Sequence, residues 1–181
     1  VTQLGIARTF QNIRLFSELS VLDNVKIAYN FHMNYGLAEA LLRFGRYFPE
    51  EKKVEEQAIE LLKIFHLEDK MYETAKNLPY GEQRRLEIAR ALATKPKLLL
   101  LDEPAAGMNP QETAELTKMI RWIREEFDLT VLLIEHDMSL VMEICEKIYV
   151  LEYGVTIAKG LPEEIRNNPR VIEAYLGEEV S

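Results

Sequence analysis

The sequence predicts an α/β fold in which a parallel sheet carries an inserted α-helical subdomain and is followed by a C-terminal hairpin and short helices. Two apolar strands, at 97–102 and 130–135, flank a helix that we expect over 110–127. A strand, a helix and a second strand in this order make parallel neighbours, because the helix carries the chain back across the sheet. The first half of the chain, in contrast, has mainly helical periodicity, which indicates the inserted subdomain.

Helices are predicted at three places in the first half. Ser20 can cap the first of them, and its apolar residues recur at helical spacing. These are Leu22, Val25, Tyr29 and Met33. A second helical stretch is expected at 37–47. Pro49 begins the third, because proline fits the first turn of a helix, and one apolar stripe then runs down to His66.

The last third of the chain predicts a hairpin and short helices. Apolar runs at 148–151 and 155–158 surround a turn at 152–154. Pro162 and Pro169 each begin a short helix. A further helix is expected near 139–146, where Cys145 lies at helical spacing among apolar neighbours. As the single cysteine of the chain it can form no internal disulfide, and we expect a buried, inert thiol.

Composition and charge limit the classes of function. Of the 181 residues, 48% are hydrophobic and 29% charged, as is typical of a globular domain with a substantial core. The net charge of −8 argues against a surface dedicated to nucleic acid. We interpret Arg84, Arg85 and Arg90 as the solvated face of an amphipathic helix. No apolar run approaches the ~20 residues that cross a bilayer, so we expect any membrane role to come through a partner, with no covalent membrane anchor.

Two adjacent carboxylates follow the first apolar strand. The leucines at 98–101 run directly into Asp102 and Glu103, at the strand end where α/β sheets bind ligands. The first carboxylate can hold Mg²⁺, usually through water, and the second can take a proton from an attacking water. Apolar strands also end at solvent with an acid for structural reasons alone, so this motif needs support from its neighbours.

Segments on both sides of the carboxylates give that support. Upstream, Gly81 lies in a loop that opens a helix, and the free N–H groups of a helix N-terminus attract phosphate. Downstream, residues 104–110 form a tight loop, and the strand at 131–135 then delivers His136 and Asp137. Two strand ends therefore present polar groups at one edge of the sheet.

In this order the segments resemble the signature loop, Walker B motif, D-loop and H-loop of ATP-binding cassette (ABC) ATPases, whose core is a P-loop NTPase-like sheet. Phe10-Gln11-Asn12 is similar to the Q-loop, which in that family joins the core to the helical subdomain. The run 8–16, the Ala-Ala-Gly-Met-Asn spelling at 105–109 and the segment from Tyr153-Gly154 through 175–177 are similar to ATPase subunits of branched-chain amino acid importers.

The resemblance implies a role for each matched residue. Asp102 would help to hold Mg²⁺, and Glu103 would be the general base. His136 would contact the γ-phosphate of ATP, and Gln11 would reach the metal or the lytic water. The signature-loop residues that would meet ATP bound by the opposite protomer are Tyr80, Gly81 and Glu82, and Asn109 of the D-loop is expected at the nucleotide as well.

The resemblance also implies partners and an organisation into parts. ATP and Mg²⁺ would be bound, and a second ATPase subunit, identical or not, would complete the site. Transmembrane permease subunits would hold the protein at the cytoplasmic face of the cell membrane, where ATP hydrolysis would energise amino-acid import. The expected parts are the end of the N-terminal core (1–12), the helical subdomain (13–95), the α/β core (96–147) and the C-terminal hairpin and helices (148–181).

The chain departs from the family pattern at two points. It contains no Gly-x-x-x-x-Gly-Lys-Ser/Thr, the phosphate-binding loop that precedes the Q-loop in the family. We expect this loop before Val1, and we expect the 181-residue chain alone to be inactive and to leave an apolar sheet edge open at 130–135. Pro79 replaces the serine of the usual signature, and Glu82 replaces the common glutamine.

Two other functions remain open. The chain can be a non-catalytic interaction module, or a truncated fragment, that docks on a complete ATPase subunit or permease. It can also be a non-transport cassette ATPase of DNA repair or chromosome maintenance, although such proteins carry long coiled-coil or zinc insertions. The stretch between Gln11 and Leu78 has neither sustained heptads nor a cysteine cluster.

Overall fold

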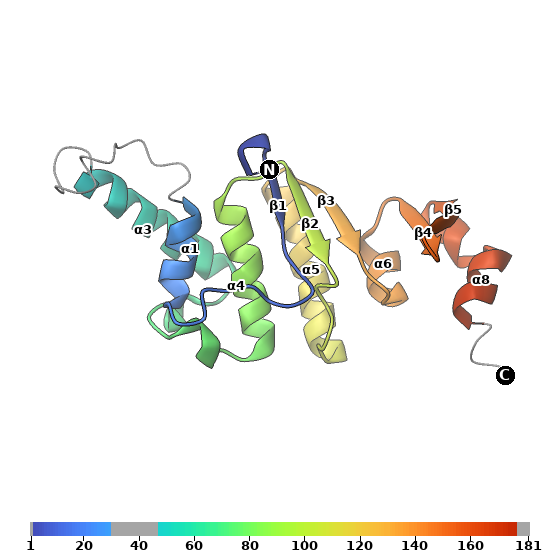
Figure 1. Cartoon of the computed structure of the whole chain (residues 1–181), viewed down its shortest axis with the longest axis horizontal. Coiled ribbons are helices and arrows are strands. Elements are labelled where there is room, and N and C mark those ends of the chain that lie inside the picture. Colours follow the sequence, from blue (N-terminus) through green and yellow to red (C-terminus); the bar gives the residue numbers. More distant parts are fainter. Residues whose placement is uncertain (1, 30–46, 177–181) are drawn as a thin grey trace.

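The computed structural model describes residues 2–29 and 47–176. Figure 1 shows a parallel sheet in the middle of an elongated molecule, helices from the first half of the chain on its left, and the hairpin with the last helices on its right. The predicted α/β class is confirmed. Met33 and, except for its last residue, the helical stretch predicted at 37–47 lie outside the described residues.

The sheet has three parallel strands in the order β1-β2-β3. They are β1 (Ile6–Arg8), β2 (Leu98–Asp102) and β3 (Thr130–Ile134). Leu98 is in register with Ile6 on one side and with Thr130 on the other. The parallel pairing predicted for the strands at 97–102 and 130–135 is therefore confirmed, and the carboxyl ends of all three strands meet at one edge.

The two faces of this sheet differ in how they are covered. On one face Leu99 and Leu101 are buried, and helix α5 (Pro110–Glu126) runs along the sheet. The helix adds to the same core Leu116, Ile120 and Ile123. On the other face Leu132 and Ile134 are 52% and 53% exposed, because alternate residues of a strand point to opposite faces. Within the described residues β3 is an edge strand, and it presents apolar side chains to solvent, as predicted for 130–135.

The helices of the first half pack into one group. They are α1 (Val21–Tyr29), α3 (Tyr47–Ile64) and α4 (Tyr80–Ala93), joined by 3₁₀ turns at Glu68–Lys70 and Ala75–Asn77, with another such turn at Thr2–Leu4. The N–H of Asp23 donates to Oγ of Ser20 at 3.0 Å, which confirms the predicted cap of α1. Helix α3 begins slightly before Pro49, so this proline lies in the first turn of the helix. Proline is tolerated there because residues of the first turn need no N–H donor. None of the helices in the described parts of the chain has the length and hydrophobicity of a membrane span.

Helix α4 buries an ion pair where a solvated basic face was predicted. The side chains of Arg84 and Glu87 are 0% and 2% exposed, and Nη1 lies 2.8 Å from Oε2. Arg84 also donates to the carbonyl oxygens of Phe10 and Gln11, at 2.6 and 2.7 Å, and Oε1 of Glu87 accepts from the N–H of Arg14 at 3.0 Å. The prediction was wrong for Arg84 because the segment that leaves β1 crosses this face of α4.

The C-terminal third has the predicted hairpin and short helices. Its elements are α6 (Met138–Ile144), β4 (Ile148–Glu152), β5 (Val155–Gly160), α7 (Pro162–Arg166) and α8 (Pro169–Leu176). Tyr153 and Gly154 have φ values of 46° and 79°, and a positive φ at both central residues is typical of the tight turn of a hairpin. Cys145 is partly buried, less than predicted, and burial raises the pKa of its thiol, which keeps the thiol protonated.

Replacing Arg84 by methionine is expected to destabilise the fold by about 3–5 kcal/mol, because the buried Glu87 carboxylate loses its cation. The double variant Arg84→Met/Glu87→Leu removes the unpaired charge and is expected to recover only part of that loss, because the main-chain groups of Phe10, Gln11 and Arg14 lose their partners. Urea unfolding of the parent chain and the two variants measures both effects. A double variant as unstable as the single one would contradict the dominance of the charge pair.

Candidate active site

Glu103 lies at the centre of the site, immediately after β2. Its backbone is left-handed, with φ 43°, which is uncommon for a residue that carries a side chain. Its N–H donates to the carbonyl oxygen of Ile134 at 2.9 Å, so the end of β2 is tied to the end of β3. The chain therefore turns away from the sheet at the residue that carries the predicted catalytic carboxylate.

Gln11 and His136 approach Glu103 from the two neighbouring strand ends. Nε2 of Gln11 donates to Oε2 of Glu103 at 2.7 Å. Nδ1 of His136 lies 3.9 Å from the same oxygen. The fold thus brings together three of the residues singled out in the sequence. The His136 side chain is 72% exposed and that of Glu103 is 28% exposed, so both are accessible to a ligand.

Glu135 is a member of the site that sequence reasoning missed. Its side chain is 1% exposed, and its Oε2 lies 3.7 Å from Nδ1 of His136. Oε1 accepts from the N–H of Ala105 at 2.9 Å, and Oε2 accepts from the N–H of His136 at 3.1 Å. This carboxylate therefore ties the loop after Glu103 to the start of the segment that carries His136. A signal was present in the sequence, since Glu135 is an acid at a strand end directly before His136.

Asp137 holds the segment that follows His136. Its carboxylate accepts from the hydroxyl and the N–H of Ser139 and from the N–H of Leu140, and it caps α6. The Ser139 hydroxyl contributes most to lowering the pKa of the Asp137 carboxyl; the N–H groups of Leu140 and Ser139 and the nearby His136 lower it further, against an opposing effect of burial. An ionised Asp137 therefore stabilises the turn that carries the histidine.

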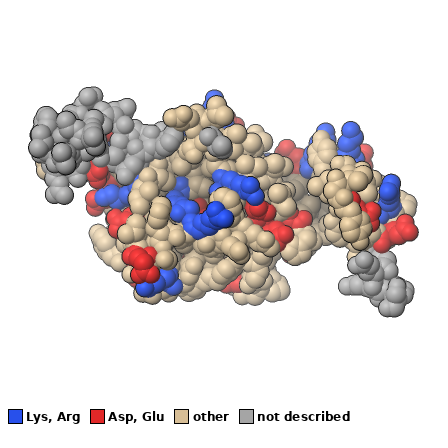
Figure 2. Space-filling model, viewed as in Figure 1, with Lys and Arg blue, Asp and Glu red and all other residues tan. Residues whose placement is uncertain are grey.

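Asp102, predicted to hold Mg²⁺, is paired with Arg8 at the end of β1. Nη2 of Arg8 lies 2.8 Å from Oδ2 of Asp102, and the two side chains are 52% and 22% exposed. The Arg8 guanidinium also lies 5.0 Å from the centre of the Phe10 ring. Figure 2 shows basic and acidic side chains next to each other near the middle of this face. Sequence reasoning missed Arg8, because only the register of β1 on β2 places it beside Asp102.

The residues predicted to meet a second nucleotide lie at the N-terminal end of α4. Pro79 occupies the N-cap position without a side-chain hydrogen bond. Both carboxylate oxygens of Glu82 accept from Nζ of Lys70, at 2.8 and 2.7 Å, so the negative charge of Glu82 is compensated. A Cβ added to Gly81 would lie 3.2 Å from Oε1 of Glu112, so a side chain at this position would press on the Glu112 carboxylate at the start of α5.

Asn109 acts as a helix cap. Its Oδ1 accepts from the N–H groups of Gln111 and Glu112, both at 3.0 Å, and its own N–H donates to Oε2 of Glu112 at 2.9 Å. These bonds form the capping box that begins α5. The side chain of Asn109 therefore has a structural role in this chain, and its contact with a nucleotide stays a prediction.

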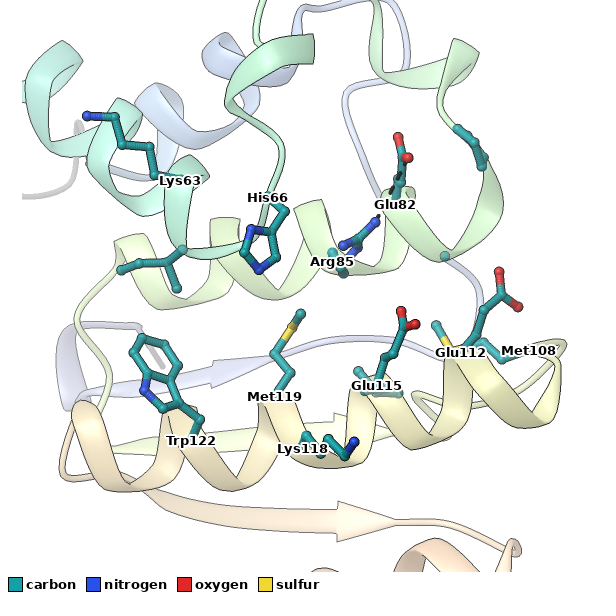
Figure 3. A pocket seen from close by; sticks show the side chains of 14 residues that line it. Lys63, His66, Glu82, Arg85, Met108, Glu112, Glu115, Lys118, Met119 and Trp122 are labelled. Atoms are coloured by element: carbon teal, nitrogen blue, oxygen red, sulfur yellow. Dashed lines mark ion pairs between the residues drawn. The ribbon is translucent and has the colours of Figure 1, made fainter.

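A cavity of about 620 Å³ lies between the helical group and α5, separate from the strand ends. Figure 3 shows Arg85 directed toward Glu82, with which it forms an ion pair at 3.9 Å, while Glu115, Met119 and Trp122 line the cavity from α5. Gly81 and Glu82 also line the cavity, whereas Gln11, Glu103 and His136 do not. This cavity beside the signature segment is therefore distinct from the site around Glu103.

The side chains of the site do not form a metal centre by themselves. Among the described residues no three His, Cys, Asp or Glu side chains gather closely enough to hold a metal ion. Asp102, Glu103 and Gln11 are the oxygen-bearing groups at the strand ends. A metal ion there would need further ligands from a bound molecule or from water.

Comparisons with known proteins give the family. Residues 2–106 match the model of the ABC transporter family, and residues 155–181 match the model described as "Branched-chain amino acid ATP-binding cassette transporter". The high-affinity branched-chain amino acid transport ATP-binding protein LivG of Salmonella typhimurium is 47% identical over 178 residues, which are 98% of this chain and 70% of LivG.

Solved structures agree with this assignment. The ATP-binding cassette MJ1267 of an ABC transporter, in its ADP conformation, matches with a TM-score of 0.77 and 28% identity over 97% of this chain and 70% of that chain. The ATP-binding cassette MJ0796, in a dimeric structure bound to ADP and Pi, matches with a TM-score of 0.69 and 25% identity over 87% of this chain and 62% of that chain. This chain belongs to the ABC transporter ATP-binding family, among its branched-chain amino acid transport members.

Proposed function

We propose that this chain serves ATP hydrolysis for the import of branched-chain amino acids, with Glu103 as the general base. The observation that carries the proposal is the convergence of Gln11 and His136 on the Glu103 carboxylate at the ends of parallel strands. The similarity to LivG, a branched-chain amino acid transport ATP-binding protein, supports the substrate class.

Each side chain of this group has a distinct task in phosphoryl transfer to water. Glu103 accepts the proton of the attacking water, and the Gln11 amide, 2.7 Å from Oε2, orients that water beside it. Nδ1 of His136 faces the carboxylates of Glu103 and Glu135, which leaves Nε2 for the γ-phosphate. The group acts through position and charge, because phosphoryl transfer requires little covalent chemistry from the protein.

We propose that Asp102 and Gln11 hold Mg²⁺ together with the phosphates of ATP. Mg²⁺ takes one or two protein carboxylates and completes its shell with water and phosphate oxygens, and the oxygen groups at the strand ends fit that demand. When bound, the ion neutralises charge on the phosphates. The Arg8 partner of Asp102 leaves the second carboxylate oxygen as the one offered to the ion or to its water.

The N-terminal end of α4 is the proposed contact with ATP on a second ATPase subunit. The dimeric structure of MJ0796 supports a paired arrangement, and Lys70 compensates the charge of Glu82 that would otherwise repel phosphate. We further propose that the pair docks on permease subunits at the cytoplasmic face of the membrane. We also propose that the chain consists of four parts, at 1–12, 13–95, 96–147 and 148–181.

The 181-residue chain alone is expected neither to bind Mg-ATP tightly nor to hydrolyse it, because its sequence contains no Gly-x-x-x-x-Gly-Lys-Ser/Thr. That loop supplies the backbone N–H groups and the lysine that hold the phosphates. Titration with a fluorescent ATP analogue and an assay of phosphate release test both parts. Saturable binding at micromolar ATP, or steady turnover by the purified chain, would show that other residues grip the phosphates.

A fusion that places the family's phosphate-loop segment, taken from LivG, ahead of Val1 is expected to bind and hydrolyse ATP. In that fusion Glu103→Gln should lower kcat by about 10²–10⁴-fold, because the amide cannot accept the proton, while ATP affinity changes little. The matched control is Glu125→Gln on the exposed side of α5, which should leave kcat unchanged. An unaltered kcat in the Glu103 variant would remove this residue from the base role.

A further inference from the structure

We infer that Arg84 is a positioning residue for the hydrolytic site: from inside α4 it holds the main chain of Phe10 and Gln11 and thereby sets the Gln11 amide on Glu103. The inference rests on the proposed function for its catalytic consequence. Its structural part concerns contacts within this chain and stands on them alone.

The guanidinium of Arg84 is bound on both of its terminal nitrogens. Nη1 donates to the carbonyl oxygen of Phe10 at 2.6 Å and to Oε2 of Glu87 at 2.8 Å. Nη2 donates to the carbonyl oxygen of Gln11 at 2.7 Å and to the hydroxyl of Tyr80 at 3.1 Å. A planar guanidinium holds its donors in a fixed fork, so two successive carbonyl groups are fixed relative to each other and to α4.

The segment that receives these bonds has no regular structure of its own. Residues 9–19, between β1 and α1, form neither helix nor strand. Its first half is held by the N–H of Thr9, which donates to the carbonyl oxygen of Leu100 at 2.9 Å, and by the bonds to Arg84 and Glu87. Its second half is held by hydrogen bonds between Phe16 and Asn24. Because the Gln11 side chain begins at the residue whose carbonyl Arg84 binds, the guanidinium limits where the Gln11 amide can lie.

Pairing with Glu87 alone does not account for this arrangement. The ion pair uses Nη1, whereas the bonds to Gln11 and Tyr80 both come from Nη2. Nε of Arg84 is buried and has no hydrogen-bond partner among the described residues. Besides pairing with Glu87, the donors of Arg84 therefore bind the main chain of Phe10 and Gln11 and the hydroxyl of Tyr80.

Through Nη2, Arg84 also joins the two segments predicted to face different nucleotides. Tyr80 is the first residue of α4, in the signature segment, and Gln11 contacts the base Glu103. One nitrogen binds both, at 3.1 and 2.7 Å. A displacement of the start of α4 therefore acts on the Gln11 main chain through one side chain, without passing through the sheet.

The variant Arg84→Lys tests the structural part on the 181-residue chain. Lysine keeps the positive charge beside Glu87, but its single ammonium replaces the fork and cannot hold both carbonyls and the tyrosine hydroxyl. In ¹⁵N-labelled chain, the side-chain amide signals of Gln11 are expected to move toward their positions in Glu103→Gln, which marks the broken contact. Arg124→Lys, the same change on α5, where Arg124 pairs with Glu146, should leave them in place.

The catalytic part is tested in the fusion that carries a phosphate loop. Arg84→Lys is expected to lower kcat about 10- to 100-fold with little change in the KM for ATP, since the side chain does not touch the nucleotide. Gln11→Ala should do the same, and the double variant should be no slower than Gln11→Ala alone. Arg124→Lys again serves as the control, and thermal unfolding of each variant confirms that it is folded.

The two arms separate the possible failures. Unchanged Gln11 amide signals in Arg84→Lys would overturn the inference, whatever the kinetics. Moved signals with additive losses of kcat in the double variant would also overturn it, because Arg84 would then act by another route. If the parent fusion hydrolyses no ATP, the proposed function fails, while the amide signals still decide whether Arg84 positions Gln11.

Discussion

The parallel register of β2 between β1 and β3 is the constraint on which the site depends. It places the carboxyl ends of the strands at one edge, and the bond from the N–H of Glu103 to Ile134 fixes the turn that carries the carboxylate. A slip of one residue would reverse the face of every side chain on a strand and would carry Asp102 away from Arg8. The register of the apolar strands thus determines which polar side chains meet at their carboxyl ends.

The buried charges of α4 solve a different problem, the placement of a segment without regular structure. A buried ion pair adds little stability, since the cost of removing both charges from water offsets their attraction. The pair of Arg84 and Glu87 instead provides directed donors and acceptors for the main chain at Phe10, Gln11 and Arg14. Apolar side chains could fill the same space but could not fix those polar groups.

Sequence periodicity predicted β2, β3, the hairpin and most helices, because each depends on neighbours within a few residues. The order of the motifs was enough to select Gln11, Glu103 and His136, which the fold brings together. What the sequence did not reveal are contacts between distant positions. Arg8 and Asp102 are 94 positions apart, and Arg84 is 74 positions from Phe10, so neither pairing leaves a local pattern.

Exposure explains why the geometry of the strand ends does not by itself make a catalyst. The His136 side chain is 72% exposed, and water weakens the field of its charges and dipoles on any bound phosphate. Electrostatic stabilisation of a transition state grows when fixed groups replace water around it. The proposed opposite protomer would supply that cover with the start of its α4, where Lys70 already compensates Glu82. In this arrangement the chain's own residues orient the reacting groups, and a second subunit excludes water and so strengthens their electrostatic effect on the bound phosphate.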